Sequence, residues 1–373
     1  MQRVESANGF ALERVTKCGN VLWQIAASAC LYPAETFPLA WSSIVGSQPR
    51  GTRLKIASSF PHGDPPDGCD RSVVGGPSTH ILTAGDLQAT FWPAAGMLGT
   101  SLRLSGVELL RRVDDLAAAR SKGSTAGIPL LYPWANRLSS LQYLAAGRQV
   151  SLDSSSPRLH FDDHRLPMHG VPWSQLQWNV VSSHADALTA RLDWLRQELL
   201  AIFPFPHHVE MAVRLRPVDL EIQTTVFADS GSPVPISFGF HPYFGLPGIP
   251  RAEWTLNAPA MRKLALDAQG IPTGQETPST PLATRLGNTG YDDGFALSSE
   301  QATFSIAGNG YSIAVEFKSG FRFAQIFAPK DKEFMAIEPM TAATNALCSG
   351  EGLRVIAPGE KFVGSFRIEV HHT

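Results

Sequence analysis

Charge and cysteine are both scarce in this sequence. Of the 373 residues, 17% are charged and four are cysteine, and the formal net charge is −2. There is no long run of Lys and Arg, which argues against nucleic acid as a partner. No apolar run reaches the roughly 18 residues that a membrane span needs, so we expect no association with a membrane.

Several common motifs are also missing. The cysteines at 18, 30, 69 and 348 form no CxxC pair, so we expect neither a zinc site nor a disulfide framework. There is no P-loop, no GxGxxG after a strand and no HExxH, so these common motifs for nucleotide cofactors and catalytic zinc are missing. No asparagine begins an N-x-[ST] sequon. The cysteine usage and the missing sequon together favour the cytoplasm.

The first 77 residues differ from the rest of the chain in composition and in hydrophobic periodicity. The stretch "GNVLWQIAASAC" has the length of a signal-peptide apolar region, but Glu5, Glu13 and Gln24 fit that interpretation poorly. Residues 47–77 are rich in Pro, Gly, Ser and Asp and show little periodicity. We therefore predict an irregular, disordered or linker-like N-terminal extension over residues 1–77 and one domain over residues 78–373.

Alternating apolar residues dominate the predicted domain. Residues 208–228 read as two strands of period two, and residues 302–317 read as a hairpin around Asn309-Gly310. That dipeptide favours a type I′ turn, because both positions tolerate positive φ. Residues 360–370 predict a closing strand, and "WLRQELLAIF" predicts one short helix. The fold class is therefore all-β, with large antiparallel sheets packed in two layers.

Isolated polar groups interrupt several apolar segments. His241 lies in "PISFGFHPYFGLPG", His169 in "LPMHGVPW" and Glu338 in "FMAIEPM". Asn136-Arg137 ends the apolar run "GIPLLYPWANRL", and Asp292-Asp293 lies in "TGYDDGFAL". Burying a charge without a partner is costly, so such groups either pair or line a cleft.

Each group also has an ordinary structural explanation. Arg137 fits a salt bridge at a loop end, and His169 fits a hydrogen-bonded turn. Asp292 and Asp293 fit a solvated turn, and Glu338 fits the exposed end of a strand. What favours one shared cleft is the occurrence of five such groups in a single β domain.

Taken in order, these segments resemble the aldose 1-epimerase (galactose mutarotase) family. "NRL" is similar to the family's Asn-Arg segment and "MHG" to its first His-Gly. "GFHPYFGLPG" is similar to the His-Pro-Tyr-Phe motif, "YDDGFAL" to the Tyr/Phe-Asp segment and "EPMTAATNAL" to the terminal glutamate segment. The resemblance covers roughly residues 78–370.

The resemblance implies a galactose mutarotase-like β-supersandwich with a carbohydrate cleft and no cofactor. The two proton-transfer residues of the family correspond to His241 and Glu338, with His169 assisting at the ring oxygen. The residues that would bind the substrate are Asn136, Arg137 and Asp292. The family often has histidine where this chain has Asp293, which is a departure from the family's pattern.

The implied chemistry suits these residue types. Interconversion of α and β anomers requires one base at the C1 hydroxyl and one acid at the ring oxygen. A glutamate serves as the base, and a histidinium serves as the acid near neutral pH. The substrate would be a small-molecule aldose, with a neutral sugar favoured because no Arg/Lys cluster accompanies the motifs.

Other functions remain open at this point. One alternative is a non-catalytic carbohydrate-binding protein that uses the same cleft. Another is a glycoside hydrolase with Asp292 and Glu338 as its carboxylate pair. A third is a metal site at His160, His164 and His169, although that spacing also fits an ordinary polar loop. The sequence is compatible with a monomer or a dimer.

Overall fold

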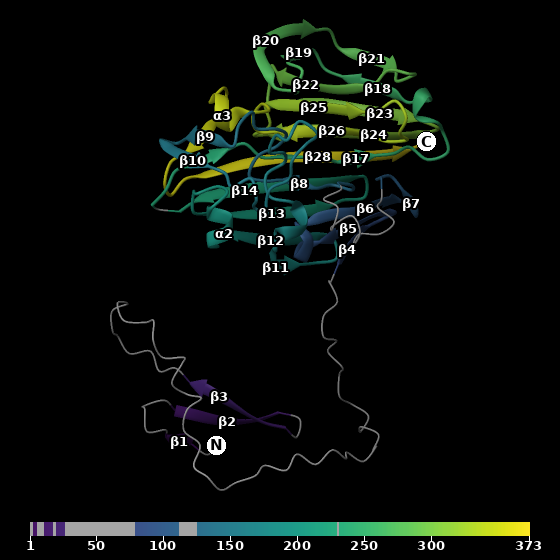
Figure 1. Ribbon diagram of the computed structural model, residues 1–373. Coiled ribbons are helices and arrows are strands. Elements are labelled where there is room, and N and C mark those ends of the chain that lie inside the picture. Colours follow the sequence, from purple (N-terminus) through teal and green to yellow (C-terminus); the bar gives the residue numbers. More distant parts are fainter. Residues whose placement is uncertain (1–2, 6–10, 18–19, 27–78, 112–124, 230) are drawn as a thin grey trace. The chain divides into compact units, whose positions relative to one another are not determined.

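The chain divides into two compact units, Met1–Arg71 and Ser72–Thr373. The computed structural model describes residues 3–5, 11–17, 20–26, 79–111, 125–229 and 231–373 (Figure 1). In the first unit, β1 (Arg3–Glu5), β2 (Ala11–Lys17) and β3 (Asn20–Ala26) form an antiparallel sheet. The extension therefore contains three short strands, while the predicted linker over residues 47–77 lies outside the described residues and stays a prediction.

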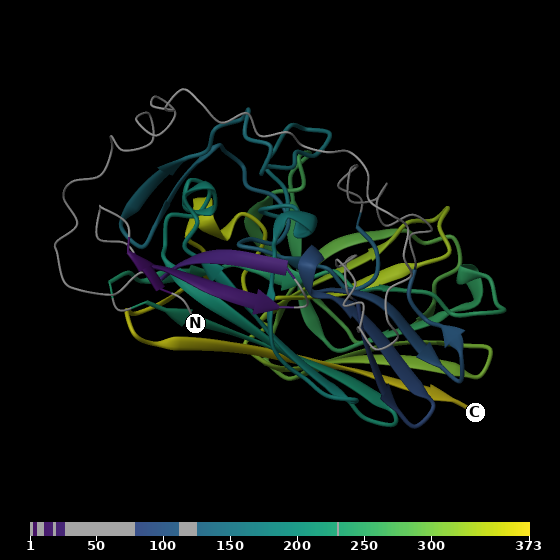
Figure 2. The ribbon, with the colours of Figure 1, turned by 90° about the horizontal axis from the view of Figure 1, so that it is seen from below.

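The second unit is built on two large antiparallel sheets, as the alternating sequence predicts. The first has nine strands in the order β11-β12-β13-β14-β28-β24-β23-β18-β21. Their bounds are β11 (Asn179–Ser183), β12 (Ala187–Trp194), β13 (His207–Leu215), β14 (Asp219–Ala228), β18 (Thr255–Ala258), β21 (Leu282–Arg285), β23 (Ala302–Gly308), β24 (Tyr311–Ser319) and β28 (Lys361–His372). In Figure 2 the yellow strand β28 runs the length of this sheet to the C-terminus.

The second large sheet follows the order β20-β19-β22-β25-β26-β16-β8, with β17 also paired to β26. Its strands are β8 (Leu130–Leu131), β16 (Gly239–Phe240), β17 (Tyr243–Phe244), β19 (Met261–Leu266), β20 (Pro272–Ser279), β22 (Tyr291–Leu297), β25 (Phe323–Ala328) and β26 (Met335–Met340). The predicted site segments at 241, 292 and 338 all belong to this sheet or to its short connections.

Smaller elements complete the second unit. The remaining strands are β4 (His80–Ala84), β5 (Leu87–Trp92), β6 (Leu98–Leu104), β7 (Val107–Glu108), β9 (Gln142–Ala145), β10 (Arg148–Ser151), β15 (Val234–Ile236) and β27 (Arg354–Ile356). The helices are α2 (Gln197–Leu200), α3 (Ala346–Ser349) and the 3-10 turns η1 (Pro93–Ala95), η2 (Trp173–Gln175) and η3 (Arg251–Glu253). Helix α2 confirms the predicted short helix. Of the helices in the described residues, none is long and apolar enough for a membrane crossing.

Alternation in the sequence becomes alternation in burial. Along β12, every second residue from Leu188 to Trp194 is buried, and β13 and β14 pair in register from His207 with Ala228 to Leu215 with Leu220. The predicted hairpin joins β23 to β24, and Asn309 and Gly310 have φ values of 51° and 78°. These two positive values are what a type I′ turn requires.

An aromatic cluster fills the space between the two large sheets. Phe240 of β16 contacts Phe366 of β28 at 5.0 Å between ring centroids, and Phe321 contacts both rings. All three side chains are fully buried. A Cβ atom at Gly364 would lie 3.1 Å from the Phe321 ring, so the glycine lets β28 approach this cluster closely. The cluster holds β16, and through it the paired strand β26, in the layer that carries the predicted site residues.

Candidate functional site

A cavity of about 550 Å³ brings together all six side chains that the sequence predicts for the site. Its volume falls within the range of roughly 300–1,000 Å³ typical of small-molecule sites. The predicted residues on its lining are Asn136, Arg137, His169, His241, Asp292 and Glu338. Five separate segments of the chain therefore converge on one place.

Strand register places His241 opposite Glu338. Gly239 pairs with Met340 and Tyr243 pairs with Ala336, so the two intervening residues meet halfway between these pairs. The Nε2 atom of His241 lies 3.1 Å from Oε1 of Glu338. Both residues were predicted from the sequence, but their contact depends on a pairing between segments about a hundred residues apart.

Aromatic neighbours fix the imidazole of His241. The ring stacks on Tyr243 at 4.1 Å between centroids and meets the Phe327 ring nearly edge-on at 5.7 Å. Pro242 has no N–H to donate, and the backbone N–H of His241 donates to the carbonyl of Pro129. The histidine therefore occupies a rigid, mostly apolar position between the short strands β16 and β17.

Burial shifts the proton affinities of this pair toward each other. Glu338 is 1% exposed, and burial, followed by the nearby charge of Asp292, raises the pKa of its carboxyl well above the usual value. Burial, followed by His169, lowers the pKa of His241 well below the usual value. The raised pKa of Glu338 and the lowered pKa of His241 each favour the neutral form of that side chain. The 3.1 Å contact, in contrast, favours a charged pair. The contact therefore joins two groups whose pKa values are shifted toward each other.

Two polar atoms of the pair have no partner. The Nδ1 atom of His241 and the Oε2 atom of Glu338 are buried without a hydrogen-bond partner among the described residues. Most buried polar atoms in proteins are hydrogen-bonded, so such exceptions call for a functional explanation. Both belong to side chains that line the cavity.

His169 is held in a defined tautomer. The backbone N–H of Asn136 donates to Nδ1 of His169 at 3.2 Å, and the backbone N–H of His169 donates to the Asn136 carbonyl at 2.9 Å. Burial, then nearby His160 and Arg137, lowers the pKa of His169 to about 3, so the imidazole is neutral near pH 7. Because Nδ1 accepts, the ring proton is on Nε2, and His169 can donate from that atom.

Strained backbone supports this arrangement. Asn136 and His169 have φ values of 54° and 60°, in the left-handed region that most residues avoid. The side chain of Asn136 also donates from Nδ2 to the Met340 sulfur at 3.3 Å, which ties its segment to the end of β26. Asn345, at φ 73°, accepts a hydrogen bond from the backbone N–H of Ser139. Such outliers concentrate at functional sites.

A carboxylate orients Arg137. The Nε atom of Arg137 lies 2.7 Å from Oδ2 of Asp162, whose other oxygen accepts the backbone N–H groups of His164 and Leu166. The loop that carries Asp162 is therefore rigid where it meets the arginine. Arg137 is in a salt bridge, as its ordinary explanation predicts, and it also lines the cavity.

Successive side chains of a strand point to opposite faces of the sheet, so Asp292 and Asp293 of β22 face different surroundings. Asp292 lines the cavity and accepts a hydrogen bond of 2.7 Å from Nε2 of Gln325. Asp293 instead forms an ion pair with Lys263. Gln325 is also the strand partner of Glu338, so β25 links the carboxylate at 292 to the buried glutamate. Asp292 thus faces the cavity, and Asp293 is directed to a lysine on β19.

The sequence also matches a known protein family. A sequence model described as aldose 1-epimerase matches residues 96–369. The chain belongs to the aldose 1-epimerase family. The match includes all the cavity residues named above and most of the second unit. A comparison with curated protein sequences found no match.

Solved structures of similar fold support the all-β supersandwich. A protein of Synechocystis sp. PCC 6803 is 23% identical, with a TM-score of 0.65, and the alignment covers 80% of this chain and 97% of that chain. A galactose mutarotase-like protein from Clostridium acetobutylicum is 18% identical, with a TM-score of 0.67 and coverages of 79% and 95%. The GalM/aldose epimerase homologue from C. elegans is 15% identical, with a TM-score of 0.66 and coverages of 79% and 99%. The predicted fold class is confirmed.

The sequence did not identify several residues of this aldose 1-epimerase-like cavity. These include Thr125, Phe161, Asp162, Asp163, Trp173, Tyr243 and Phe327. Tyr243 lies in the quoted histidine motif and was detectable there, whereas Asp162 sits in a polar loop and becomes significant only through its contact with Arg137.

The three histidines considered as metal ligands all line the cavity. His160, His164 and His169 share its wall. Within the part of the chain that the structure describes, however, no three His, Cys, Asp or Glu side chains cluster in a way that could hold a metal ion.

Proposed function

We propose that this protein interconverts the α and β anomers of a hexose by acid–base opening and closing of the pyranose ring. The observation that carries the proposal is the buried 3.1 Å contact between His241 and Glu338 inside a sugar-sized cavity. Membership of the aldose 1-epimerase family supports the same reaction type.

In this proposal the pair holds one proton, initially on His241, and supplies both catalytic functions. When a sugar enters between the two groups, the Glu338 carboxylate accepts the proton of the C1 hydroxyl, and His241 delivers its proton to the ring oxygen. The C1–O5 bond breaks and leaves an open aldehyde. The pair then holds its proton on Glu338, so its total proton count is unchanged. Rotation about C1–C2 and reversal of both transfers give the other anomer.

Four other side chains assist in this proposal. His169 donates from Nε2 near the ring oxygen, because its tautomer is fixed by the backbone of Asn136. Arg137 and Asp292 hold sugar hydroxyls, each oriented by a partner of its own. Asn136 contributes to substrate binding through its position on the cavity wall.

The deciding experiment is polarimetry on freshly dissolved pure anomers of several hexoses. We expect decay of optical rotation faster than the spontaneous rate, and a bell-shaped pH profile of kcat/KM. Activity should fall on the acid side when the pair gains a second proton and on the alkaline side when it loses its only one. Binding without acceleration would indicate a non-catalytic carbohydrate-binding protein, and release of reducing sugar from a glycoside would indicate a hydrolase that uses Asp292 and Glu338.

We further propose that the protein acts on a soluble small-molecule aldose in the cytoplasm, without a cofactor. The neutral character of the sugar is supported by the ion pair of Arg137 with Asp162, which leaves that guanidinium partly neutralised.

A further inference from the structure

Arg111 is an arginine near His241 that does not line the main cavity. Its guanidinium carbon lies 4.5 Å from the ring centroid of Phe334 and 5.5 Å from that of Tyr243. Both distances fall within the roughly 6 Å over which an aromatic face attracts a cation. Tyr243 in turn stacks on His241, with 4.1 Å between the centroids and 14° between the ring planes. One aromatic ring therefore connects Arg111 to the proposed acid.

Backbone hydrogen bonds hold Arg111 next to Tyr243. The backbone N–H of Arg111 donates to the carbonyl of Tyr243 at 2.9 Å, and the backbone N–H of Tyr243 donates to the carbonyl of Gly127 at 2.9 Å. The backbone N–H of Gly127 donates to the carbonyl of Arg111 at 3.1 Å and closes the circle. Gly127 has a φ of 67°, and a Cβ atom there would lie 2.1 Å from the carbonyl oxygen of Gly99, so the position requires glycine.

Side-chain contacts fix the plane of the Tyr243 ring. Its hydroxyl is hydrogen-bonded to the hydroxyl of Thr125, and Nη1 of Arg111 donates to the Thr125 carbonyl at 3.4 Å. Phe334 meets the Tyr243 ring edge-on at 5.4 Å between centroids. Tyr243 is 4% exposed. The ring cannot turn away from His241 without breaking these contacts.

Arg111 and Arg137 act on different members of the buried pair. Burial is the largest cause of the lowered pKa of His241, followed by His169, and the charge of Arg111 lowers it further. The charge of Arg137 acts on Glu338 instead, where burial nevertheless raises the pKa of the carboxyl. Since His169 is neutral near pH 7, Arg111 is the cation that opposes a proton on His241. The charged and titratable side chains that face the His241 ring are Glu338, His169, Tyr243 and Arg111, with Asp292 and Arg137 across the cavity.

We propose that Arg111 is a positioning residue for the acid of the reaction: it acts through Tyr243 to hold the His241 ring in place, and its charge favours transfer of the His241 proton to the ring oxygen of the sugar. The N–H bond of His241 breaks as the new O–H bond forms, and the neutral imidazole remains. A nearby cation destabilises the histidinium relative to this neutral ring, so it makes His241 a stronger acid. The inference rests on the proposed epimerase function for the direction of the transfer.

Replacement of Arg111 in the full-length protein tests this role. Arg111→Met keeps an unbranched side chain that packs well on aromatic rings, but it removes the charge. In polarimetry, kcat near pH 7 should fall about 3–10-fold, because a weaker acid transfers its proton more slowly. The alkaline limb of the kcat/KM profile should move to higher pH, because His241 then keeps its proton longer. The deficit relative to wild type should therefore shrink as the pH rises.

NMR measures the proton on His241 independently of catalysis. The carbon-bound protons of this imidazole are assigned by their loss in His241→Asn and then followed as the pH is varied. Their titration midpoint should lie at higher pH in Arg111→Met than in the wild-type protein, because the repulsion of the histidinium is gone. A purely structural role of Arg111 would not move this midpoint.

Three further variants separate charge from packing. Arg111→Lys keeps the cation, so the alkaline limb and the midpoint should stay close to the wild-type values even if kcat changes. Arg111→Gln is uncharged and should shift both like Arg111→Met, which keeps the test valid if the methionine variant does not fold. Arg285→Met removes an exposed arginine from the edge strand β21 and is the control that should change neither kcat nor the limb.

The outcomes distinguish the role of Arg111 from the proposed reaction. If sugars are epimerised but the uncharged variants lower kcat equally at every pH and leave the midpoint in place, the inference is wrong and the reaction stands. A shift in Arg111→Lys as large as that in Arg111→Met also overturns it, because charge is then not the cause. If the midpoint moves as expected but no sugar is epimerised, the reaction is wrong, while the effect of Arg111 on the imidazole stands.

Discussion

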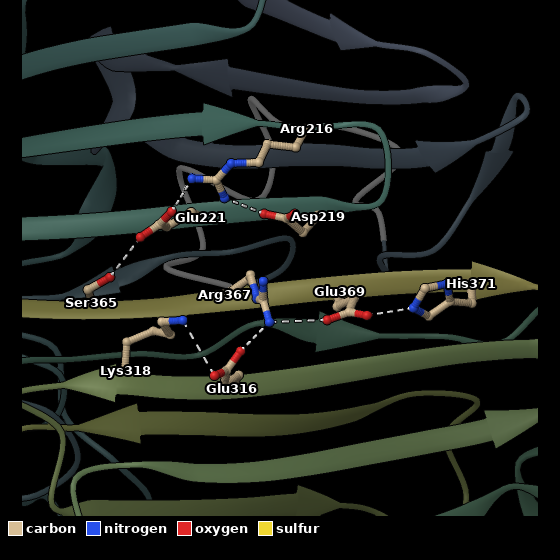
Figure 3. A network of polar contacts seen from close by, with 9 residues as sticks. All are labelled: Arg216, Asp219, Glu221, Glu316, Lys318, Ser365, Arg367, Glu369 and His371. Carbon is tan, nitrogen blue, oxygen red and sulfur yellow. Dashed lines mark hydrogen bonds and ion pairs between the residues drawn. The ribbon is translucent and has the colours of Figure 1, made fainter.

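Two groups of paired charges in this molecule differ mainly in burial. On the nine-stranded sheet, neighbouring strands β14, β28 and β24 carry a network of ion pairs and hydrogen bonds in two separate parts, one around Arg216 and one around Arg367 (Figure 3). Arg367 contacts both Glu316 and Glu369, and each of these three side chains is about 30% exposed. On the eight-stranded sheet, the side chains of His241 and Glu338 are 7% and 2% exposed.

The difference shows that pairing alone does not make a functional site. Solvent-exposed ion pairs contribute about 0–1 kcal/mol each, because water screens the charges and the side chains lose freedom. In the cavity, burial opposes both charged forms and shifts both pKa values, as is common at functional sites. The network contributes to the sheet surface, whereas the buried pair is suited to move protons.

The largest expected effect comes from breaking the buried pair. Glu338→Gln keeps the shape but cannot accept the C1 proton, and His241→Asn cannot deliver one. Each should lower kcat about 10²–10⁴-fold with a much smaller change in KM. Because the two act as a unit, the double variant should be little worse than the worse single variant.

Polarimetry on a purified anomer measures this effect. The surface substitution Glu316→Gln, which also removes one carboxylate from an ion pair, is the matched control and should keep wild-type kcat. Near-normal kcat in either cavity variant would contradict the acid–base assignment and make His169 the next candidate for the acid.

The next largest effect is expected on the pH dependence of stability, from a histidine that is buried without an ion pair. His207 is fully buried beside Tyr132, and burial lowers its pKa to about 4. The unfolded chain binds this proton below pH about 6.5 but the folded protein does not, so stability is full above that pH and falls on acidification. One such group accounts for about 3 kcal/mol of unfolding free energy between pH 6.5 and 4.

Urea unfolding at a series of pH values checks this prediction. His207→Gln should flatten the acid slope by the equivalent of one proton, even if it lowers stability at every pH. The exposed His184→Gln serves as control and should leave the slope as it is. An unchanged slope in His207→Gln would show that the buried imidazole is not the group responsible.

A smaller effect is expected on substrate binding when Asp292 is replaced. Asp292→Asn retains the side-chain shape but removes the charge that faces the sugar, so KM should rise about 10–100-fold with little change in kcat. Asp293→Asn, which faces Lys263, is the neighbouring control and should leave KM unchanged. Unchanged kinetics in Asp292→Asn across several sugars would remove this residue from the site.

The smallest effect is expected on the exposed network. Lys318→Ala should change the free energy of unfolding by less than about 1 kcal/mol, and added salt should reduce the difference. Chemical denaturation at low and high ionic strength measures it. A loss that is larger, or independent of salt, would mean that the network behaves like the buried pair.

The sequence predicted features that depend on local pattern. Alternation located β13, β14 and β28, and Asn309-Gly310 located a hairpin, because turn chemistry and side-chain period are properties of neighbouring residues. The six candidate site residues could be predicted for a similar reason, because each is a polar group within an apolar segment.

What the sequence could not provide depends on distant pairing. The contact of Asp162 with Arg137, that of Gln325 with Asp292 and the opposition of His241 to Glu338 all require strand register between remote segments. The lowered pKa of His169 and His241 follows from burial, which composition does not reveal.

The pairing of β26 with β16 and β17 has a consequence for how the protein acquires activity. Segments near residues 130, 240 and 338 must meet before His241 faces Glu338, and closing such long loops is slow compared with forming local hairpins. During refolding, the hairpin of β23 and β24 can form early, while the cavity is completed only after the last remote strands join. Recovery of catalysis should therefore lag behind recovery of strand signal in circular dichroism, which makes enzymatic turnover a probe for the final stage of folding.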